Sequence, residues 1–282
     1  MAIKLIIDSA SDVDGAEAKE RNITMIPMEI SFGDETYLDG VTLSRNKFFE
    51  KLVESDVFPK TSQINKFRFA EVFERTVEDG SEAICIVMSS KLSSTYLSAA
   101  EAAEKFCGRV RVIDSQNACI GERILLDYAQ KLIDEGGTLD DVENRLNAVK
   151  GNIRVLALLG TLQYLQKGGR ISHLTAFAGG LLNVKPVVAV EGGEVKLVGK
   201  ALGLKKGNNL LVQMIGKSGG IDFDMPYCAG YSGLSDELLK KYLNDSAYIW
   251  QEHTPSVPCH QIGSTIGAHV GPGGIAVAFF AK

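Results

Sequence analysis

Residues 87–96 read Val-Met-Ser-Ser-Lys-Leu-Ser-Ser-Thr-Tyr, and this stretch joins a predicted buried strand to a predicted helix. The strand is the apolar run from Ala83 to Met88, which is too short for a typical helix. The helix follows at once, because apolar residues recur three and four positions apart, at Tyr96, Ala99, Ala103 and Phe106. A strand that passes directly into a helix is typical of an α/β fold.

Four serines and a threonine gather at this junction. The free N–H groups and the positive end of the dipole at a helix start attract anions, so the hydroxyls could take part in binding one. Ser93 or Ser94 could equally serve as a simple helix cap. Both interpretations remain open from this stretch alone.

The first 150 residues repeat the same arrangement. Ile3 to Ile7 reads as a buried strand that ends in the polar segment Asp8-Ser-Ala-Ser-Asp12, and Val110 to Ile113 reads as another that ends in Asp114-Ser115. Alternating strands and helices predict a mainly parallel sheet flanked by helices, with polar residues gathered at the carboxyl ends of its strands. Ligands bind at that edge in such sheets. Pro59 to Gln63 reads as a loop.

The pattern changes after residue 150. A predicted hairpin with its turn at Gly192-Gly193 and further strands near 227–230 and 276–280 are interspersed with predicted helices at 204–215 and 235–243. We therefore expect an α/β protein with two domains, an N-terminal one over 1–150 and a C-terminal mixed α/β domain over 151–282.

Composition narrows the function. A net charge of −5 argues against a nucleic-acid partner, which would usually meet a basic face. The first residues turn polar after about five apolar positions, and no apolar run approaches the roughly 18 residues that cross a bilayer. We expect a cytoplasmic protein with no stable membrane insertion.

Several common chemistries lack their motifs. There is no P-loop, and Asp8 to Asp12 stands where the glycines of a dinucleotide site would lie. Neither the four histidines nor the five cysteines show the spacing of a metal site, so no metal and no cofactor is expected.

Two residues could assist in holding an anion. Arg170 follows two glycines and carries a permanent charge in a planar fork that matches carboxylate or phosphate. His269 lies in a segment rich in glycine, where we expect a tight loop that exposes the ring. A surface arginine and a packing histidine are the alternatives.

Seven segments, taken in order over nearly the whole length, together resemble the DegV family. They are Asp8-Ser-Ala-Ser-Asp12, Thr61-Ser-Gln63, Ser89-Ser-Lys-Leu-Ser-Ser-Thr95, Asp114-Ser115, Gly168-Gly-Arg-Ile171, Lys185-Pro186 and Ile266-Gly-Ala-His-Val-Gly-Pro-Gly273. The resemblance implies two α/β domains with a long-chain fatty acid, such as palmitate, in the cleft between them. Similar proteins are the acyl-carrying subunit of bacterial fatty acid kinase. There, a separate ATP-binding subunit related to dihydroxyacetone kinases phosphorylates the carboxylate of the carried acid.

The resemblance also assigns the site. Thr61, Ser62, Ser93 and Ser94 would hold the fatty acid carboxylate, with Arg170 and His269 in support. Phe177, Leu181, Leu182 and Ile266 are predicted to line the acyl tunnel, although ordinary core packing would suit each of them equally.

The sequence departs from the family pattern in two places. Ser93-Ser94-Thr95 stands where relatives usually have Ser-Gly-Thr, so either serine could face the ligand. Leu202 and Leu204 stand where relatives commonly carry arginines associated with docking the kinase subunit, which leaves the engagement of such a partner open.

Two other functions are compatible with these residues. The protein could be an acyl or phosphoryl hydrolase or transferase in which Ser93 or Ser94 is the nucleophile and His269 the base. It could also be a regulatory protein that senses lipid, with the same pocket and a different partner.

Overall fold

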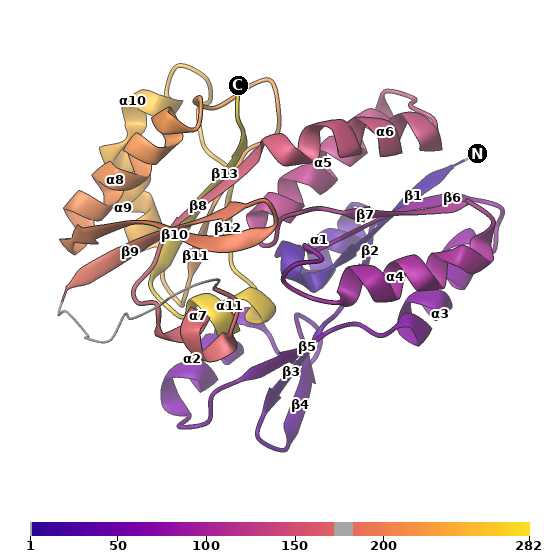
Figure 1. Cartoon of the computed structure of the whole chain (residues 1–282), viewed down its shortest axis with the longest axis horizontal. Coiled ribbons are helices and arrows are strands. Elements are labelled where there is room, and N and C mark those ends of the chain that lie inside the picture. Colours follow the sequence, from indigo (N-terminus) through magenta and orange to yellow (C-terminus); the bar gives the residue numbers. More distant parts are fainter. Residues whose placement is uncertain (1, 172–182) are drawn as a thin grey trace.

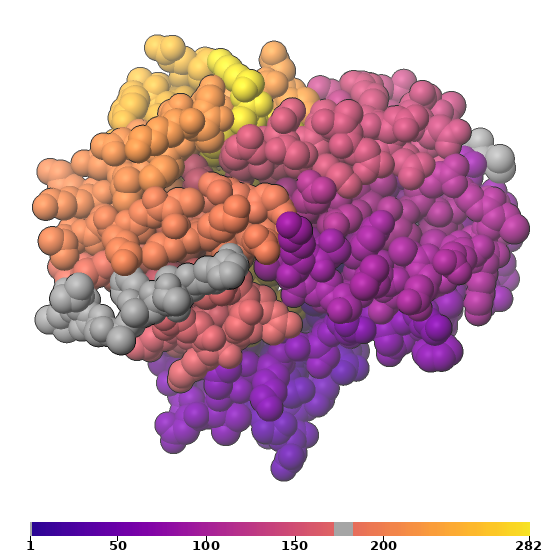
Figure 2. Space-filling model, viewed as in Figure 1, coloured from indigo at the N-terminus to yellow at the C-terminus, as the bar shows by residue number. Residues whose placement is uncertain are grey.

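The chain forms three β-sheets surrounded by helices, as shown in Figure 1 by a computed structural model that describes residues 2–171 and 183–282. A four-stranded and a three-stranded sheet come from the residues before 115, and a six-stranded sheet comes from those after 152. Figure 2 shows the two larger halves in contact along a seam, with the β3–β4 hairpin projecting below them.

The four-stranded sheet is entirely parallel, as the sequence predicts. Its apolar side chains are buried because helices cover both faces. The strand order is β2-β1-β6-β7, with bounds β1 (Ile3–Asp8), β2 (Thr24–Ile26), β6 (Glu82–Val87) and β7 (Val110–Asp114).

Two helix pairs pack on opposite faces of this sheet, and a short helix, α1 (Gly15–Glu20), joins β1 to β2 (Figure 1). One pair is α3 (Lys66–Val77) and α4 (Thr95–Ala103), and the other is α5 (Ile120–Asp134) and α6 (Leu139–Val149). Short 3-10 turns lie at Ser9–Ser11, Glu104–Phe106 and Lys150–Asn152. The expected domain division at residue 150 falls at the last of these turns and stays a prediction.

The three-stranded sheet corrects one expectation. Residues expected to form a loop, Pro59 to Gln63, include β5 (Lys60–Ser62), which pairs with β3 (Glu29–Phe32) in antiparallel register. The pairing brings Thr61 opposite Ile30, a long-range contact that local turn signals cannot reveal. β4 (Glu35–Leu38) completes the hairpin, and α2 (Arg45–Glu54) packs beside it.

The six-stranded sheet is mixed, in agreement with the predicted mixed α/β class. Only β12 runs parallel to its neighbour, and the β9–β10 hairpin turns at Gly192-Gly193 as predicted. The order is β10-β9-β8-β13-β11-β12, with bounds β8 (Ile153–Leu158), β9 (Val184–Glu191), β10 (Glu194–Leu202), β11 (Cys228–Ser232), β12 (Cys259–Gln261) and β13 (Gly274–Phe280). The outer face is covered by α8 (Gly203–Lys217) and α9 (Glu237–Asp245), and α10 (Ala247–Trp250) follows them.

Helix α5 connects the two large sheets. It packs against β1 and β6 on one side and against β8, β11 and β13 on the other, and most of its residues are buried. The approach to β8 is so close that a side chain at Gly121 would collide with Val155. This packing holds the halves together on one side of their seam.

Two short helices, α7 (Gln163–Gly168) and α11 (Ser264–Val270), pack against each other on the inner side of the six-stranded sheet. The tight loop expected around His269 is therefore wrong: His269 and Gly267 lie within α11, and the glycines with positive φ, Gly271 and Gly273, come after the helix. Gly267 is required by packing, because a Cβ there would lie 2.7 Å from Phe48 Cε1 and 3.0 Å from Phe49 Cζ.

We expect Gly267→Ala to destabilise the protein by about 1–3 kcal/mol, because the added methyl group would overpack against two buried rings. Gly216→Ala is the matched control, since this glycine lies in α8 with open space around its Cα. That change should be neutral or stabilising by up to about 1 kcal/mol. Urea unfolding of both variants measures the difference, and equal stabilities would contradict the packing argument.

Candidate functional site

A large cavity lies between the inner face of the six-stranded sheet and the N-terminal half of the chain. Its empty volume is about 990 Å³, counted to its mouth and including space open to solvent. The lining is mostly aliphatic, with Met28, Met88, Leu92, Val155, Ala157, Leu159, Leu165, Val188, Val190, Val195, Ile262, Ile266 and Val270 among its residues.

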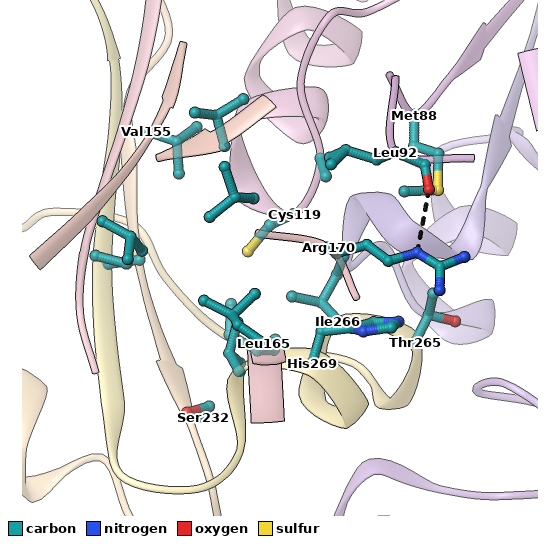
Figure 3. Close-up of a pocket in the computed structure, with 18 of the residues that line it drawn as sticks. Met88, Leu92, Cys119, Val155, Leu165, Arg170, Ser232, Thr265, Ile266 and His269 are labelled. Atoms are coloured by element: carbon teal, nitrogen blue, oxygen red, sulfur yellow. Dashed lines mark hydrogen bonds between the residues drawn. The ribbon is translucent and has the colours of Figure 1, made fainter. Parts of the chain in front are cut away.

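Polar side chains gather on one side of this cavity. Of the predicted carboxylate-binding residues, Thr61, Ser62 and Ser93 line it, as do Arg170 and His269. They come from β5, the loop before α4, the segment after α7, and α11. Figure 3 shows Arg170 and His269 on the same side, with Val155 and the strands of the six-stranded sheet on the other. The cavity is thus an apolar space with one polar margin.

The stretch 87–96, between β6 and α4, contributes Ser93 to this margin. Ser93 Oγ accepts a hydrogen bond from the Thr95 N–H at 3.3 Å and lies 2.9 Å from Thr95 Oγ1. Ser94 occupies the N-cap position of α4 but makes no capping bond with its side chain, is exposed, and is not among the lining residues. Ser93 therefore combines a local backbone contact with a position at the cavity.

His269 is held against Thr61. Its Nε2 lies 3.0 Å from Thr61 Oγ1, while its Nδ1 is buried and has no partner within the described ranges 2–171 and 183–282. Burial, together with the charge of Arg170, lowers the pKa of this histidine to about 4. The imidazole is therefore neutral near pH 7, and its two nitrogens comprise one donor and one acceptor.

Arg170 is placed by the two glycines before it. Gly169 ends α7 with a φ of +67°, and a side chain at Gly168 would collide with the His269 ring. The guanidinium donates from Nε to the Leu92 carbonyl at 3.4 Å and from Nη1 to the Gly168 carbonyl at 2.8 Å. These bonds hold a permanent positive charge at the cavity margin, beside the loop that carries Ser93.

Two buried aspartates from the N-terminal half hold α11 in place. Asp39 accepts hydrogen bonds from the N–H groups of Ser264 (3.1 Å) and Thr265 (3.0 Å) and from Thr265 Oγ1 (2.6 Å). Asp12 accepts from the Gly263 N–H at 2.7 Å, and burial raises the pKa of its carboxyl to about 6. The helix that carries Ile266 and His269 is thereby fixed to the start of the chain.

The predicted tunnel residues are only partly described. Ile266 lines the cavity, whereas Phe177, Leu181 and Leu182 lie outside the described residues. Sequence reasoning missed the sheet residues of the cavity wall, although the alternation along the strands could have identified a shared face. It also missed Thr265, for which no local signal exists.

Leu202 and Leu204 lie at the end of β10 and the start of α8, away from the cavity lining. They are 62% and 38% exposed. Both side chains are therefore accessible to a partner protein.

The described ranges contain no cluster of histidine, cysteine and acidic side chains that could hold a metal ion. Nor do they include a helix with the length and apolarity needed to span a membrane.

Comparison with known proteins agrees with the fold. The sequence model of the DegV family matches residues 2–282. A DegV domain-containing protein of Caldanaerobacter subterraneus subsp. tengcongensis is 31% identical over 283 residues, which cover 99% of each chain. A fatty-acid-binding DegV family protein from Thermus thermophilus superposes with a TM-score of 0.89 at 27% identity over 100% of both chains. A stearic-acid-binding protein from Eubacterium ventriosum has a TM-score of 0.87 at 26% identity, covering 100% of this chain and 99% of the other.

The fold and the cavity define a class of two-part α/β proteins with an apolar cavity enclosed between their sheets and polar side chains along one margin. Within that class, the chain belongs to the DegV family.

We expect acid to destabilise the ligand-free protein through His269. The folded-state pKa is about 4, whereas the ordinary value is 6.5, so below pH 6.5 the unfolded chain takes up a proton that the native state does not. Stability should therefore fall between about pH 6.5 and pH 4, by up to roughly 1.4 kcal/mol per pH unit.

His269→Gln is the control, because it removes this titration and leaves the buried carboxylates in place. The difference between the urea-unfolding free energies of wild type and variant, followed from pH 7 to pH 4, isolates the histidine. Parallel pH profiles would show that His269 is not buried in its neutral form.

Proposed function

We propose that this protein binds a long-chain fatty acid, with the acyl chain in the apolar cavity and the carboxylate at Thr61, Ser62 and Ser93. The observation that carries the proposal is the separation of polarity within a single cavity: hydroxyls, one arginine and one neutral imidazole on one margin, and aliphatic side chains over the rest. An amphiphile with a small anionic head and a long apolar tail matches both parts.

The energetics are consistent with tight retention. Each methylene buried in the cavity contributes about 0.8 kcal/mol, so an acyl chain supplies most of the affinity. Hydroxyl and imidazole donors, together with the charge of Arg170, can hold the carboxylate by charge-assisted hydrogen bonds. Ser93 is better placed for this contact than Ser94, because only Ser93 lines the cavity.

The solved relatives support the same ligand class, since one is a fatty-acid-binding protein and the other a stearic-acid-binding protein. They share the fold over essentially the full length of this chain. Together with the cavity, this likeness favours a carrier that does not itself catalyse a reaction.

We further propose that the bound carboxylate is presented to a separate ATP-binding subunit related to dihydroxyacetone kinases. In that reaction a carboxylate oxygen attacks the γ-phosphorus of ATP and the bond to ADP breaks, which leaves an acyl phosphate. The exposed positions of Ser62 and Arg170 at the cavity margin support this role, because a phosphoryl donor must reach the head group from outside.

A serine hydrolase or transferase is less well supported. His269 is bonded to Thr61 and, within the described residues, no hydrogen bond joins it to Ser93 or Ser94 or to a carboxylate that would orient it. A base that activates a nucleophile needs both contacts.

Ser93→Ala should weaken palmitate binding by about ten- to a hundredfold, because it removes a hydroxyl that bonds the carboxylate. Thr61→Val, which keeps the side-chain shape, should act in the same direction. The measurement is calorimetric titration of delipidated protein with palmitate, with melting temperatures recorded to detect any loss of fold.

Ser94→Ala is the matched control and should bind palmitate as wild type does, since Ser94 is exposed and outside the cavity. Equal losses of palmitate affinity in the Ser93 and Ser94 variants would show that the carboxylate-binding residues are wrongly assigned. Failure of wild type to bind palmitate at all would overturn the proposed function.

With palmitate bound, a purified kinase subunit and ATP should convert the acid to acyl phosphate, which hydroxylamine traps as the hydroxamate. Palmitate with the kinase subunit but without this protein is the control. A Leu202→Arg, Leu204→Arg double variant should raise the rate at limiting kinase concentration if the leucines weaken docking. A loaded protein that yields no hydroxamate would show that it does not serve this kinase.

A further inference from the structure

One hydroxyl lies on the apolar wall of the cavity, away from the head-group residues. The six-stranded sheet contributes valine, alanine, isoleucine and glycine to the lining, and Ser232 is the single polar side chain among its described lining residues. Ser232 and Gly230 lie two positions apart on β11 and so face the cavity together, while Tyr231 between them packs on the other face.

The hydroxyl of Ser232 is buried and accepts a hydrogen bond, but within the described residues it donates none. The side chain is 3% exposed, and its Oγ accepts a hydrogen bond from the Gly274 N–H at 2.9 Å. Among the described residues, no acceptor takes the hydroxyl proton, so within them this donor of the cavity lining has no partner. A buried hydrogen-bond donor without an acceptor is unfavourable, unless a molecule in the cavity provides the acceptor.

The neighbour across the sheet leaves this hydroxyl uncovered. Gly274 pairs with Ser232 in the register of β11 and β13, and a Cβ at that glycine would lie 2.8 Å from Ser232 Oγ. Glycine at this position therefore keeps the space beside the hydroxyl free.

Ser232 is separated from the head-group residues by apolar side chains. In the view of Figure 3, Leu165 lies between Ser232 and the side that carries Arg170 and His269. Leu159 also packs near Ser232, against a methyl position at Gly274. The hydroxyl therefore faces the path of the acyl chain.

We propose that the cavity is adapted to a fatty acid with a hydroxyl group on its chain, and that Ser232 donates a hydrogen bond to that hydroxyl oxygen. This inference rests on the proposed fatty acid binding and names the ligand class more closely. An unmodified chain leaves the Ser232 donor unpaired, whereas the oxygen of a chain hydroxyl accepts its hydrogen bond. A site that offers a buried partner discriminates against the analogue that lacks the matching group.

The test is competition between stearate and a set of hydroxystearic acids that differ in the position of the hydroxyl, including the terminal one. Delipidated wild-type protein is mixed with each pair, and bound ligand is counted by native mass spectrometry. We expect at least one hydroxystearate to be preferred by about three- to tenfold, the effect of one net hydrogen bond. If wild type binds stearate but prefers no member of the set, the inference is overturned while fatty acid binding stands.

Ser232→Ala should abolish that preference, because it removes the donor that pairs with the chain hydroxyl. Ser232→Cys, which keeps the side-chain volume and a weaker donor, covers the case in which the alanine variant does not fold. Ser246→Ala is the matched control, because this serine is buried outside the cavity, where it donates to the Tyr242 carbonyl. An unchanged preference in the Ser232 variants would overturn the role of Ser232. If wild type binds neither acid, the proposed function fails first.

Discussion

The attachment of α11 to two buried carboxylates is the interaction on which the cavity depends. Asp12 and Asp39 belong to the first 40 residues, and they accept the N–H groups at the start of a helix near the end of the chain. A buried carboxylate is costly unless hydrogen bonds satisfy it, and unpaired N–H groups at a helix start are costly for the same reason. Each group thus reduces the penalty of the other, and α11 is fixed as one wall of the cavity. Without that wall, Thr61 would lose His269 and the sheet would face solvent.

The cavity lies where helices cover the apolar inner face of the six-stranded sheet without filling all the space above it. The inner face of the six-stranded sheet is aliphatic, and α5, α7 and α11 cover it while leaving an unfilled space at its centre. Close packing normally removes such a space. The mostly aliphatic lining of this space is consistent with a resident apolar ligand, and the polar margin determines which end of that ligand faces outward. Burial keeps His269 neutral there, so Arg170 supplies the positive charge of this margin.

Much of the fold was predictable from the sequence, and the site was predictable in part. The apolar run before Met88 and the helical spacing after it predicted β6 and α4, because both signals are local. The same stretch indicated Ser93 but could not distinguish it from Ser94, since that choice depends on which hydroxyl the loop turns inward. Thr61 was assigned to a loop, because its pairing with β3 is a long-range contact. His269 was expected on an exposed turn, because glycines usually indicate turns. Here Gly267 and Gly271 are also required by the aromatic rings packed against them, which the sequence does not reveal.

The sequence by itself determined the fold class, the parallel sheet of the first half and the hydroxyl-rich strand end, because periodicity and capping act over a few neighbouring residues. Only the tertiary structure decided that Thr61 meets His269 across 208 positions, that α11 docks on Asp12 and Asp39, and that Ser232 lies in the aliphatic wall of the cavity. These contacts join segments far apart in the chain. They form only when the two large sheets close around α5, and no local pattern encodes that closure.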